Sequence, residues 1–296
     1  MRGINGMRLS TSTNIYFNRP DGTKADITDS MRRCAAAGYR VMDLNFHDCT
    51  TFRLPFVSNQ YQRWTEEIGE LAEELGLSFN QAHSAFYNFC DERYTNREYM
   101  DGMVLRTIEC AGVLGIPYVV IHAGTDFESA EYRRTSKQKN TEYFLPLIEF
   151  AEKKNTRLVF ENLWDLNIYP LRRYTANAEE LVDFVDSLNA PSVGICYDTD
   201  HVTLMGQSHS RSLYLIGKRL VATHISDCIS VECDHILPYS GRIDWDEVTL
   251  SLRKTGYSGD FTYEIHRYTQ SLPDAVVDSA LRYSVEVGEH LITKCR

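Results

Sequence analysis

The most constraining feature of this sequence is a junction that recurs along its whole length. A polar, helix-like segment ends in Gly or Asn, and the chain then runs directly into a short apolar segment, as in "LAEELGLSFNQAH" and "CAGVLGIPYVVIH". A residue in the left-handed region typically closes a helix at such a position. These closing residues are Gly38, Gly76, Gly115, Asn155 and Gly256.

The spacing of the junctions predicts the fold class. Strands are expected to start near residues 7, 39, 77, 117, 157, 192, 220 and 260, about 36 residues apart, which is enough for a strand, a loop, a helix and a turn. Helices are expected over 28–36, 58–75, 98–114, 141–153, 177–188, 208–218, 245–255 and 272–290. Capping-box pairs mark three of their starts: Asn177 with Glu180, Asp244 with Glu247, and Ser271 with Asp274.

Eight strand–helix units of this length predict an α/β protein, a closed parallel (β/α)8 TIM barrel, with residues 1–296 as a single domain. A doubly wound open sheet is the alternative, but it needs a Gly-rich phosphate loop after an early strand, and the sequence has none. The segments expected after the strands are long and should build the active-site face of the barrel: 14–27, 46–57, 84–97, 123–140 and 226–243.

The composition restricts the classes of function. The formal net charge of −10 weighs against DNA or RNA as a partner, because nucleic-acid binders carry a basic field. No stretch approaches the roughly 18 apolar residues of a membrane span, and the N-terminal segment lacks the apolar core of a signal peptide. The eight cysteines are scattered through the chain, which predicts free thiols in a reducing compartment. These features predict a cytoplasmic protein.

Four acid or histidine side chains stand at the ends of successive apolar segments: Glu161, Asp198, His224 and Glu264. Carboxylates are depleted in strand interiors, and an unpaired buried charge costs several kcal/mol. A shared divalent metal ion would compensate all four, and a buried salt-bridge network is the alternative. Three carboxylates and one imidazole favour Mn²⁺, with Mg²⁺, Co²⁺ or Zn²⁺ as other ions that this set could hold.

Other polar side chains are expected around the same mouth of the barrel. His83 and His122 end the third and fourth strands, and the loops after later strands contribute further candidates for substrate contacts: Trp164, His201, His235 and Arg242. Arg267 is a second candidate for an anionic substrate, and Asp227 is expected to orient His224 from behind. Aromatic residues in these loops could pack on a sugar ring: Phe17, Phe52, Phe56, Phe86, Tyr87, Phe89, Trp164 and Tyr169.

At these residues the sequence resembles the xylose isomerase-like TIM barrels, the sugar phosphate isomerase and epimerase superfamily that also includes apurinic endonucleases. The most specific segments are "CYDTDH" and "HISD…HILPYSGRIDW", with the glutamates of "FEN" and "YEIH", and the resemblance covers nearly the whole chain. It implies that Glu161, Asp198, His224 and Glu264 are metal ligands and that His201 contacts substrate. The segment Pro238-Tyr239-Ser240 is less glycine-rich than the family pattern.

The residues and the resemblance together predict a metal-dependent sugar, or sugar phosphate, isomerase or epimerase. Glu161 and Glu264 would serve as base and acid on either side of a cis-enediolate. An apurinic endonuclease-like phosphodiesterase is an alternative, since the histidines and acids also fall where that branch places three zinc ions, although Cys233 stands where an Asp is expected. An inosose-type dehydratase and a non-catalytic sugar-binding barrel are further alternatives. The expected partner is a small carbohydrate, and self-association is left open.

Overall fold

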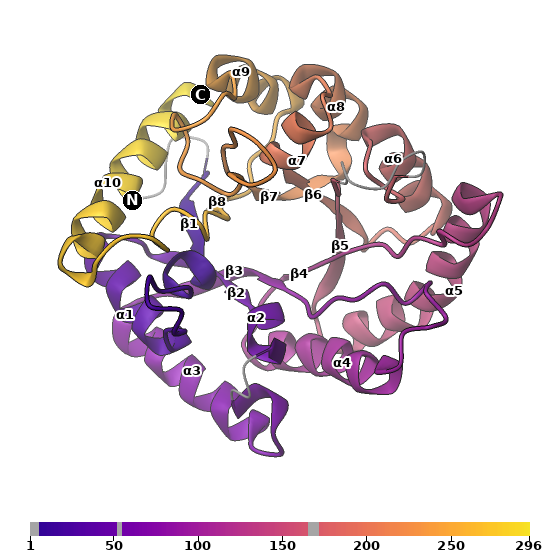
Figure 1. Cartoon of the computed structure of the whole chain (residues 1–296), viewed down its shortest axis with the longest axis horizontal. Helices are drawn as coiled ribbons and strands as arrows, with labels where there is room; N and C mark the ends of the chain where they lie inside the picture. The colour runs from indigo at the N-terminus through magenta and orange to yellow at the C-terminus, as the bar shows by residue number, and fades with distance from the viewer. Residues whose placement is uncertain (1–5, 52–54, 165–171) are drawn as a thin grey trace.

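The computed structural model describes residues 6–51, 55–164 and 172–296. Within these ranges, eight parallel strands form one sheet in the order β7-β6-β5-β4-β3-β2-β1-β8, which confirms the TIM barrel (Figure 1). The strands are β1 Leu9–Ser12, β2 Val41–Asn45, β3 Ser78–His83, β4 Tyr118–Ile121, β5 Arg157–Glu161, β6 Gly194–Asp198, β7 Leu220–His224 and β8 Phe261–Tyr263. Ile225, directly after β7, closes the ring, because it forms a parallel bridge to Tyr263 of β8.

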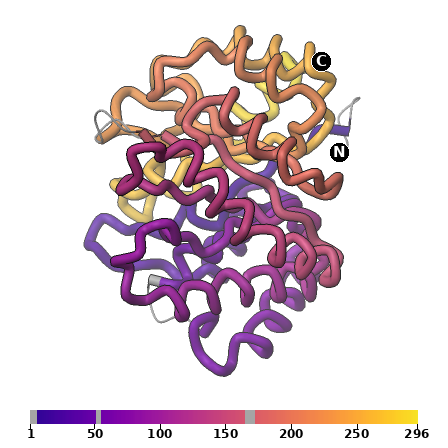
Figure 2. The backbone as a smooth tube through the Cα atoms, turned by 90° about the vertical axis from the view of Figure 1, so that its right-hand side faces the viewer, coloured from indigo at the N-terminus to yellow at the C-terminus, as the bar shows by residue number. Residues whose placement is uncertain are grey.

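The helices form the outer ring around the strands, as Figures 1 and 2 show. The long ones are α1 Ile27–Ala37, α3 Tyr61–Leu75, α4 Arg97–Val113, α5 Tyr132–Lys153, α6 Ala178–Ser187, α8 His209–Ile216, α9 Trp245–Thr255 and α10 Asp274–Lys294. Gly38, Gly76 and Gly256 close α1, α3 and α9 with positive φ, as predicted. No helix within the described ranges is long and apolar enough to cross a bilayer.

Several short helices lie in the loops after the strands, where the sequence predicted only loop. They are η1 Thr13–Tyr16, α2 Phe46–Thr51, η2 Pro55–Val57 and α7 Thr199–Leu204, and η3 Gly217–Arg219 follows α8. Asp198, the last residue of β6, also caps α7, because its side chain accepts from the His201 amide. A candidate ligand is therefore held by the start of a helix that begins directly at the strand end.

Two sequence-based expectations about helix starts are wrong. Helix α5 begins at Tyr132 rather than 141, so the basic run 132–139 forms its first turns instead of a loop. The added turns are polar yet partly buried, because Ser136 and Asn140 accept hydrogen bonds from the backbone amides of Asp126 and Gly124. At α10 the cap position is Pro273, without a side-chain cap, and not Ser271. The predicted caps Asn177 and Asp244 are confirmed.

The apolar core has two parts. The main cluster fills the space between the sheet and the outer helices and contains residues such as Phe144, Phe160 and Phe184. A second, separate cluster consists of one residue from each of β4 to β7: Val120, Val159, Cys196 and Ala222. These residues alternate along their strands with members of the main cluster, so they lie inside the barrel. All eight cysteines are free, as predicted.

Two glycines of α4 offer a matched test of helix packing. A Cβ at Gly112 would lie 2.6 Å from the Lys154 carbonyl oxygen, whereas a Cβ at Gly102 would meet nothing within 4 Å. We expect Gly112→Ala to lower the free energy of unfolding by about 1–3 kcal/mol through overpacking, and Gly102→Ala to raise it by about 0.5–1 kcal/mol. Urea unfolding of both variants would measure this, and equal shifts would contradict the close approach of α4 to Lys154.

Candidate active site

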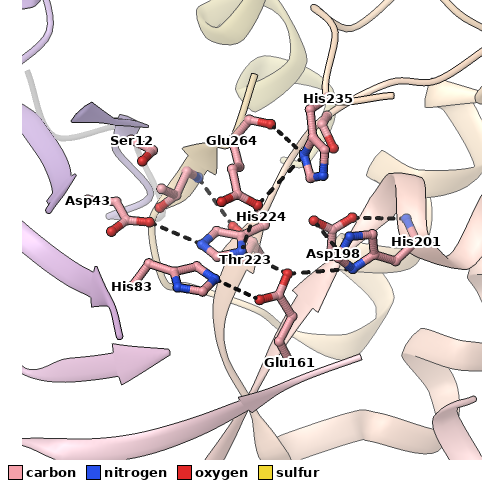
Figure 3. A network of polar contacts seen from close by, with 12 residues as sticks. Ser12, Asp43, His83, Glu161, Asp198, His201, Thr223, His224, His235 and Glu264 are labelled. Carbon is pink, nitrogen blue, oxygen red and sulfur yellow. Dashed lines mark hydrogen bonds and ion pairs between the residues drawn. The ribbon is translucent and has the colours of Figure 1, made fainter. Parts of the chain in front are cut away.

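The four residues singled out in the sequence converge at the carboxyl ends of the strands. Glu161, Asp198 and His224 are the last residues of β5, β6 and β7, and Glu264 directly follows β8. Their ligand atoms all lie within 4.8 Å of one another, and each residue is 7% exposed or less. Figure 3 shows the four side chains pointing toward one another. The barrel thus brings together groups that lie more than a hundred residues apart in the sequence.

His224 lies at the centre of this set. Its Nδ1 is 3.0 Å from Glu161 Oε1 and 3.3 Å from Glu264 Oε2, while its Nε2 donates to Asp43 Oδ2 at 3.1 Å. Burial alone would lower the pKa of His224, but Cys196 and the Glu264 and Glu161 carboxylates raise that pKa well above its ordinary value. In the protein without metal, a protonated ring therefore supplies the positive charge that this acidic set requires.

The carboxyl groups of Glu161 and Asp198 have opposite environments. Burial would raise the pKa of Glu161, but His224 and hydrogen bonds from His122, His224 and His83 hold it well below its ordinary value. Burial and the neighbouring carboxylates of Asp200 and Glu161 raise the pKa of Asp198 well above its ordinary value.

Asp198 also keeps one oxygen available. Its backbone is clamped by Asn162, whose side chain accepts from the Asp198 amide at 2.8 Å and donates to the Asp198 carbonyl at 3.0 Å. Its Oδ1 accepts from the His201 amide, whereas Oδ2 is buried without a hydrogen-bond partner. A buried, unpartnered carboxylate oxygen that faces two further carboxylates and an imidazole fits a divalent cation of the Mn²⁺ or Mg²⁺ type.

The remaining predicted histidines lie beside this set. His122 Nε2 is 3.0 Å from Glu161 Oε2, and His83 Nε2 is 3.5 Å from the same oxygen. His201 and His235 flank Asp200, with nitrogens 3.8 Å and 3.6 Å from its carboxylate oxygens. Three further groups could therefore hold an ion: His83, His224 and Glu264; His83, His122 and Glu161; and Asp198, Asp200, His201 and His235. The last of these groups takes its carboxylates from Asp198 and Asp200 and none from position 233, which is a cysteine.

The set opens into a cavity of about 350 Å³, a size that suits a small ligand. Predicted residues that line it are His83, Phe86, His122, Glu161, Trp164, His201, His235 and Glu264. Among the other aromatic candidates, Phe56 and Phe89 are buried in the main core, and Phe52 and Tyr169 lie outside the described residues.

Three residues predicted for the site lie elsewhere. Asp227 does not orient His224: its carboxylate accepts from the amides of Cys228, Tyr239 and Ile243 and from Trp245 Nε1, so it organises the loop after β7. Asp43 of β2 contacts His224 instead. Arg242 is absent from the lining of the cavity and donates to the Thr203 carbonyl, and Arg267 pairs with Asp234.

Some residues of the site were not found from the sequence. Arg173 is the one Lys or Arg among the residues described as lining the cavity, and Asp48 lines it from α2. Burial and the nearby Glu264 raise the pKa of Asp48 to about 6. Asp43 carries the same sequence signal as the four central residues, an acid inside an apolar run, "VMDLN". That signal was available in the sequence, whereas nothing local marks Arg173.

Comparison with known proteins shows the family of this chain. Residues 31–286 match the family described as the xylose isomerase-like TIM barrel. The chain belongs to this family. The resemblance seen in the sequence is thereby confirmed, and the matched range contains the four residues of the central set: Glu161, Asp198, His224 and Glu264.

Several relatives are named as sugar epimerases or isomerases, and another is named as a probable endonuclease 4, 26% identical over 105 residues. Inosose isomerase of Bacillus subtilis is 24% identical over 213 residues, 68% of this chain and 73% of that protein. D-psicose 3-epimerase of Enterocloster bolteae is 23% identical over 242 residues, 79% of this chain and 75% of that protein. The uncharacterized protein y4fM of Sinorhizobium fredii is 29% identical over 210 residues, and this chain covers 65% of its length. The structure of D-psicose 3-epimerase from Clostridium cellulolyticum H10 has a TM-score of 0.75 at 16% identity, with 97% of this chain and 99% of that chain covered.

The raised pKa of Asp198 leads to a prediction about stability. Folding raises this pKa above its ordinary 3.8, so Asp198 favours the folded state below about pH 4 and loses that contribution as the pH rises toward the folded-state pKa. We expect Asp198→Asn to stabilise chelator-treated protein at pH 7 by about 1 kcal/mol or more, and this gain to shrink toward pH 4.

Urea unfolding in EDTA at several pH values would measure the effect. Asp227→Asn is the matched control, because that buried carboxylate has four donors and its loss should destabilise the protein. A loss of stability in Asp198→Asn at pH 7 would contradict the assigned environment of Asp198.

Proposed function

We propose that this chain is a divalent-metal-dependent epimerase or isomerase of a sugar, with residues 1–296 as one catalytic domain. The observation that carries the proposal is the placement of Glu161 and Glu264. They come from strands separated by β6 and β7, both face His224 Nδ1, at 3.0 Å and 3.3 Å, and both line the same cavity. Two carboxylates in this arrangement can each reach the same carbon of a bound sugar, one from each side.

The same set would hold the metal ion. Glu161, Asp198, Glu264 and His224 would be its ligands, and the oxygen-rich donor set favours Mn²⁺ over Mg²⁺, Co²⁺ or Zn²⁺. A bound divalent ion would stabilise the negative charge that develops on the sugar oxygens as a carbon-bound proton leaves.

The proposed reaction is a proton transfer next to the sugar carbonyl through a cis-enediolate. Glu161 or Glu264 removes the proton from carbon, and the other carboxyl group returns one to the opposite face, which gives epimerisation. Return of the proton to the neighbouring carbon by the first carboxyl group gives aldose–ketose isomerisation. The relatives support proton transfer next to a carbonyl group, since one is a D-psicose 3-epimerase and another an inosose isomerase.

The other lining residues would bind the sugar and exclude water. His83, His122, His201 and His235 surround the carboxylates and can donate to hydroxyl groups. Phe86 stacks on His47 with ring centroids 3.8 Å apart, and Trp164 lies with its ring centroid 6.3 Å from that of His201. These rings supply flat apolar faces suited to the carbon-bound hydrogens of a sugar ring. Arg173 is the candidate for an anionic group of the substrate.

A second candidate function is a metal-dependent phosphodiesterase like the apurinic endonucleases. The observation that favours it is the presence of two additional potential ion-binding groups beside the central one, built on His83 with His122 and on His201 with His235. The net charge of −10 opposes binding to a polyanion. Nicking of abasic DNA at physiological salt would favour this candidate over the first.

Metal binding gives the first test of the proposal. Mn²⁺ added to chelator-treated protein at about 100 times its dissociation constant should stabilise the folded state by about 2.7 kcal/mol. Elemental analysis after dialysis should find about one divalent ion per chain for the epimerase, and about three zinc ions for the phosphodiesterase. Protein that takes up no divalent ion and shows no change in thermal midpoint would refute the proposed metal dependence.

Hydrogen exchange tests the carboxylates directly. When D-psicose is incubated with the Mn²⁺-loaded protein in D₂O, the hydrogen on the carbon next to its carbonyl group should exchange with solvent deuterium. Glu264→Gln should slow that exchange about 10²- to 10⁴-fold or abolish it. The Mn²⁺ content of the variant would be measured in parallel. Glu286→Gln, an exposed change on α10, is the control and should exchange normally. Exchange by Glu264→Gln at the normal rate would refute the role assigned to Glu264.

A further inference from the structure

The barrel interior beneath the site is polar on one side. On the side of β4 to β7 it is filled by the apolar cluster Val120, Val159, Cys196 and Ala222. On the side of β1, β2, β3 and β8 the inward residues are polar and 7% exposed or less: Ser10, Asp43, Asn80, Gln81 and Thr262. Branched apolar residues usually fill TIM-barrel interiors, and buried polar groups are costly unless they are hydrogen-bonded. This polar column therefore needs an explanation.

The column is a continuous chain of hydrogen bonds that all run in one direction. Ser10 Oγ donates to Asn80 Oδ1 at 3.0 Å, and Asn80 Nδ2 donates to Thr262 Oγ1 at 2.8 Å. Thr262 Oγ1 donates to Gln81 Oε1 at 3.3 Å, and Gln81 Nε2 donates to Asp43 Oδ2 at 3.4 Å. Hydrogen bonds aligned in this way polarise one another, and here they end on a carboxylate.

A bulge in β3 makes this series of hydrogen bonds possible. The register between β2 and β3 shifts between Met42 and Asp43, whose partners are Phe79 and Gln81, so Asn80 is the extra residue of a bulge. Two consecutive residues, Asn80 and Gln81, can therefore both reach Thr262 of β8 across the interior. Regular pairing would direct only one of them inward.

This series of hydrogen bonds ends at the ring of His224. Asp43 Oδ2, which accepts from Gln81, also accepts from His224 Nε2 at 3.1 Å, and Figure 3 shows Asp43 on the side of this ring opposite Asp198. Gln81 Nε2 contacts the carbonyl oxygen of Thr223 as well, at 3.4 Å, and thus holds the strand residue next to His224. Asp43 and His224 are both fully buried, so solvent cannot replace these contacts.

We propose that Asp43 is a positioning residue and that the column Ser10–Asn80–Thr262–Gln81 fixes it. The column keeps Asp43 as an acceptor, which holds the proton of neutral His224 on Nε2 and leaves the Nδ1 lone pair toward Glu161, Asp198 and Glu264. The inference rests on the proposed function, because it assigns His224 Nδ1 as a metal-ligand atom. Partners of this kind set the tautomer and orientation of a ligating histidine.

Metal affinity separates positioning from a merely structural role. Asp43→Ala should weaken Mn²⁺ binding, measured by calorimetric titration, about 10- to 100-fold. Thr262→Val keeps the side-chain volume but breaks the column in its middle, and should weaken binding in the same direction by a smaller factor. Thr249→Val is the matched control, because it removes a buried hydroxyl that bonds only within α9, and it should bind Mn²⁺ like the unchanged protein.

A spectroscopic measurement tests the tautomer itself. In ¹⁵N-labelled, Zn²⁺-loaded protein, the His224 ring should carry its proton on Nε2 and lack one on Nδ1. In Asp43→Ala this Nε2–H signal should shift or exchange faster with solvent, whereas Asp43→Asn, which keeps an acceptor oxygen, should restore part of both the signal and the Mn²⁺ affinity.

The outcomes distinguish this inference from the proposed function. Unchanged Mn²⁺ affinity in both Asp43→Ala and Thr262→Val, or a Zn²⁺-loaded protein with its His224 proton on Nδ1, would overturn the inference and leave the metal dependence intact. If Asp43→Ala does not fold, Thr262→Val and Asp43→Asn decide the question. Unchanged protein that binds neither Mn²⁺ nor Zn²⁺ would overturn both.

Discussion

The concentration of negative charge at the carboxyl ends of β5, β6 and β8 is the constraint on which the rest of this structure depends. Glu161, Asp198 and Glu264 are nearly excluded from solvent, and carboxylate oxygens of the three lie within 4.8 Å of one another. Burial, together with their mutual repulsion in a medium of low polarity, raises the pKa of Asp198 and favours a positive partner. The chain itself provides one, a protonated His224, and the same place suits a divalent cation.

This constraint accounts for the division of the barrel interior. The apolar half at β4 to β7 supplies packing beneath the carboxylates, while the polar half at β1, β2, β3 and β8 holds Asp43 against His224. Polar residues in the loops after the strands also form hydrogen bonds that fix the surroundings of the site. Asn162 binds the backbone of Asp198, and Asp227 links the loop after β7 to Trp245. The rigid elements therefore position the ligand atoms, and the loops shape the cavity above them.

Much of the architecture could be predicted from local signals. The expected strand starts fall within two residues of the observed ones, because a left-handed Gly or Asn fixes where each helix ends and the strand begins. The start of α5 could not be predicted from the sequence, because Ser136 and Asn140 are polar residues typical of a solvated loop. They are buried against the loop after β4, from which they accept hydrogen bonds. The short helix α7 was also missed, because its cap is Asp198, which the sequence marked only as a candidate metal ligand at the end of a strand.

The sequence by itself determined the barrel and its four central side chains, because an acid or a histidine at the end of an apolar strand is a local anomaly that needs no knowledge of contacts. Only the tertiary structure decided which other groups contact these side chains or line the same cavity. Asp43 rather than Asp227 contacts His224, Asp200 joins His201 and His235, and Arg173 rather than Arg242 lines the cavity. The physical reason is closure of the sheet: it brings β2 within three strands of β7, by way of β1 and β8, and sets distances across the interior that no spacing along the chain encodes.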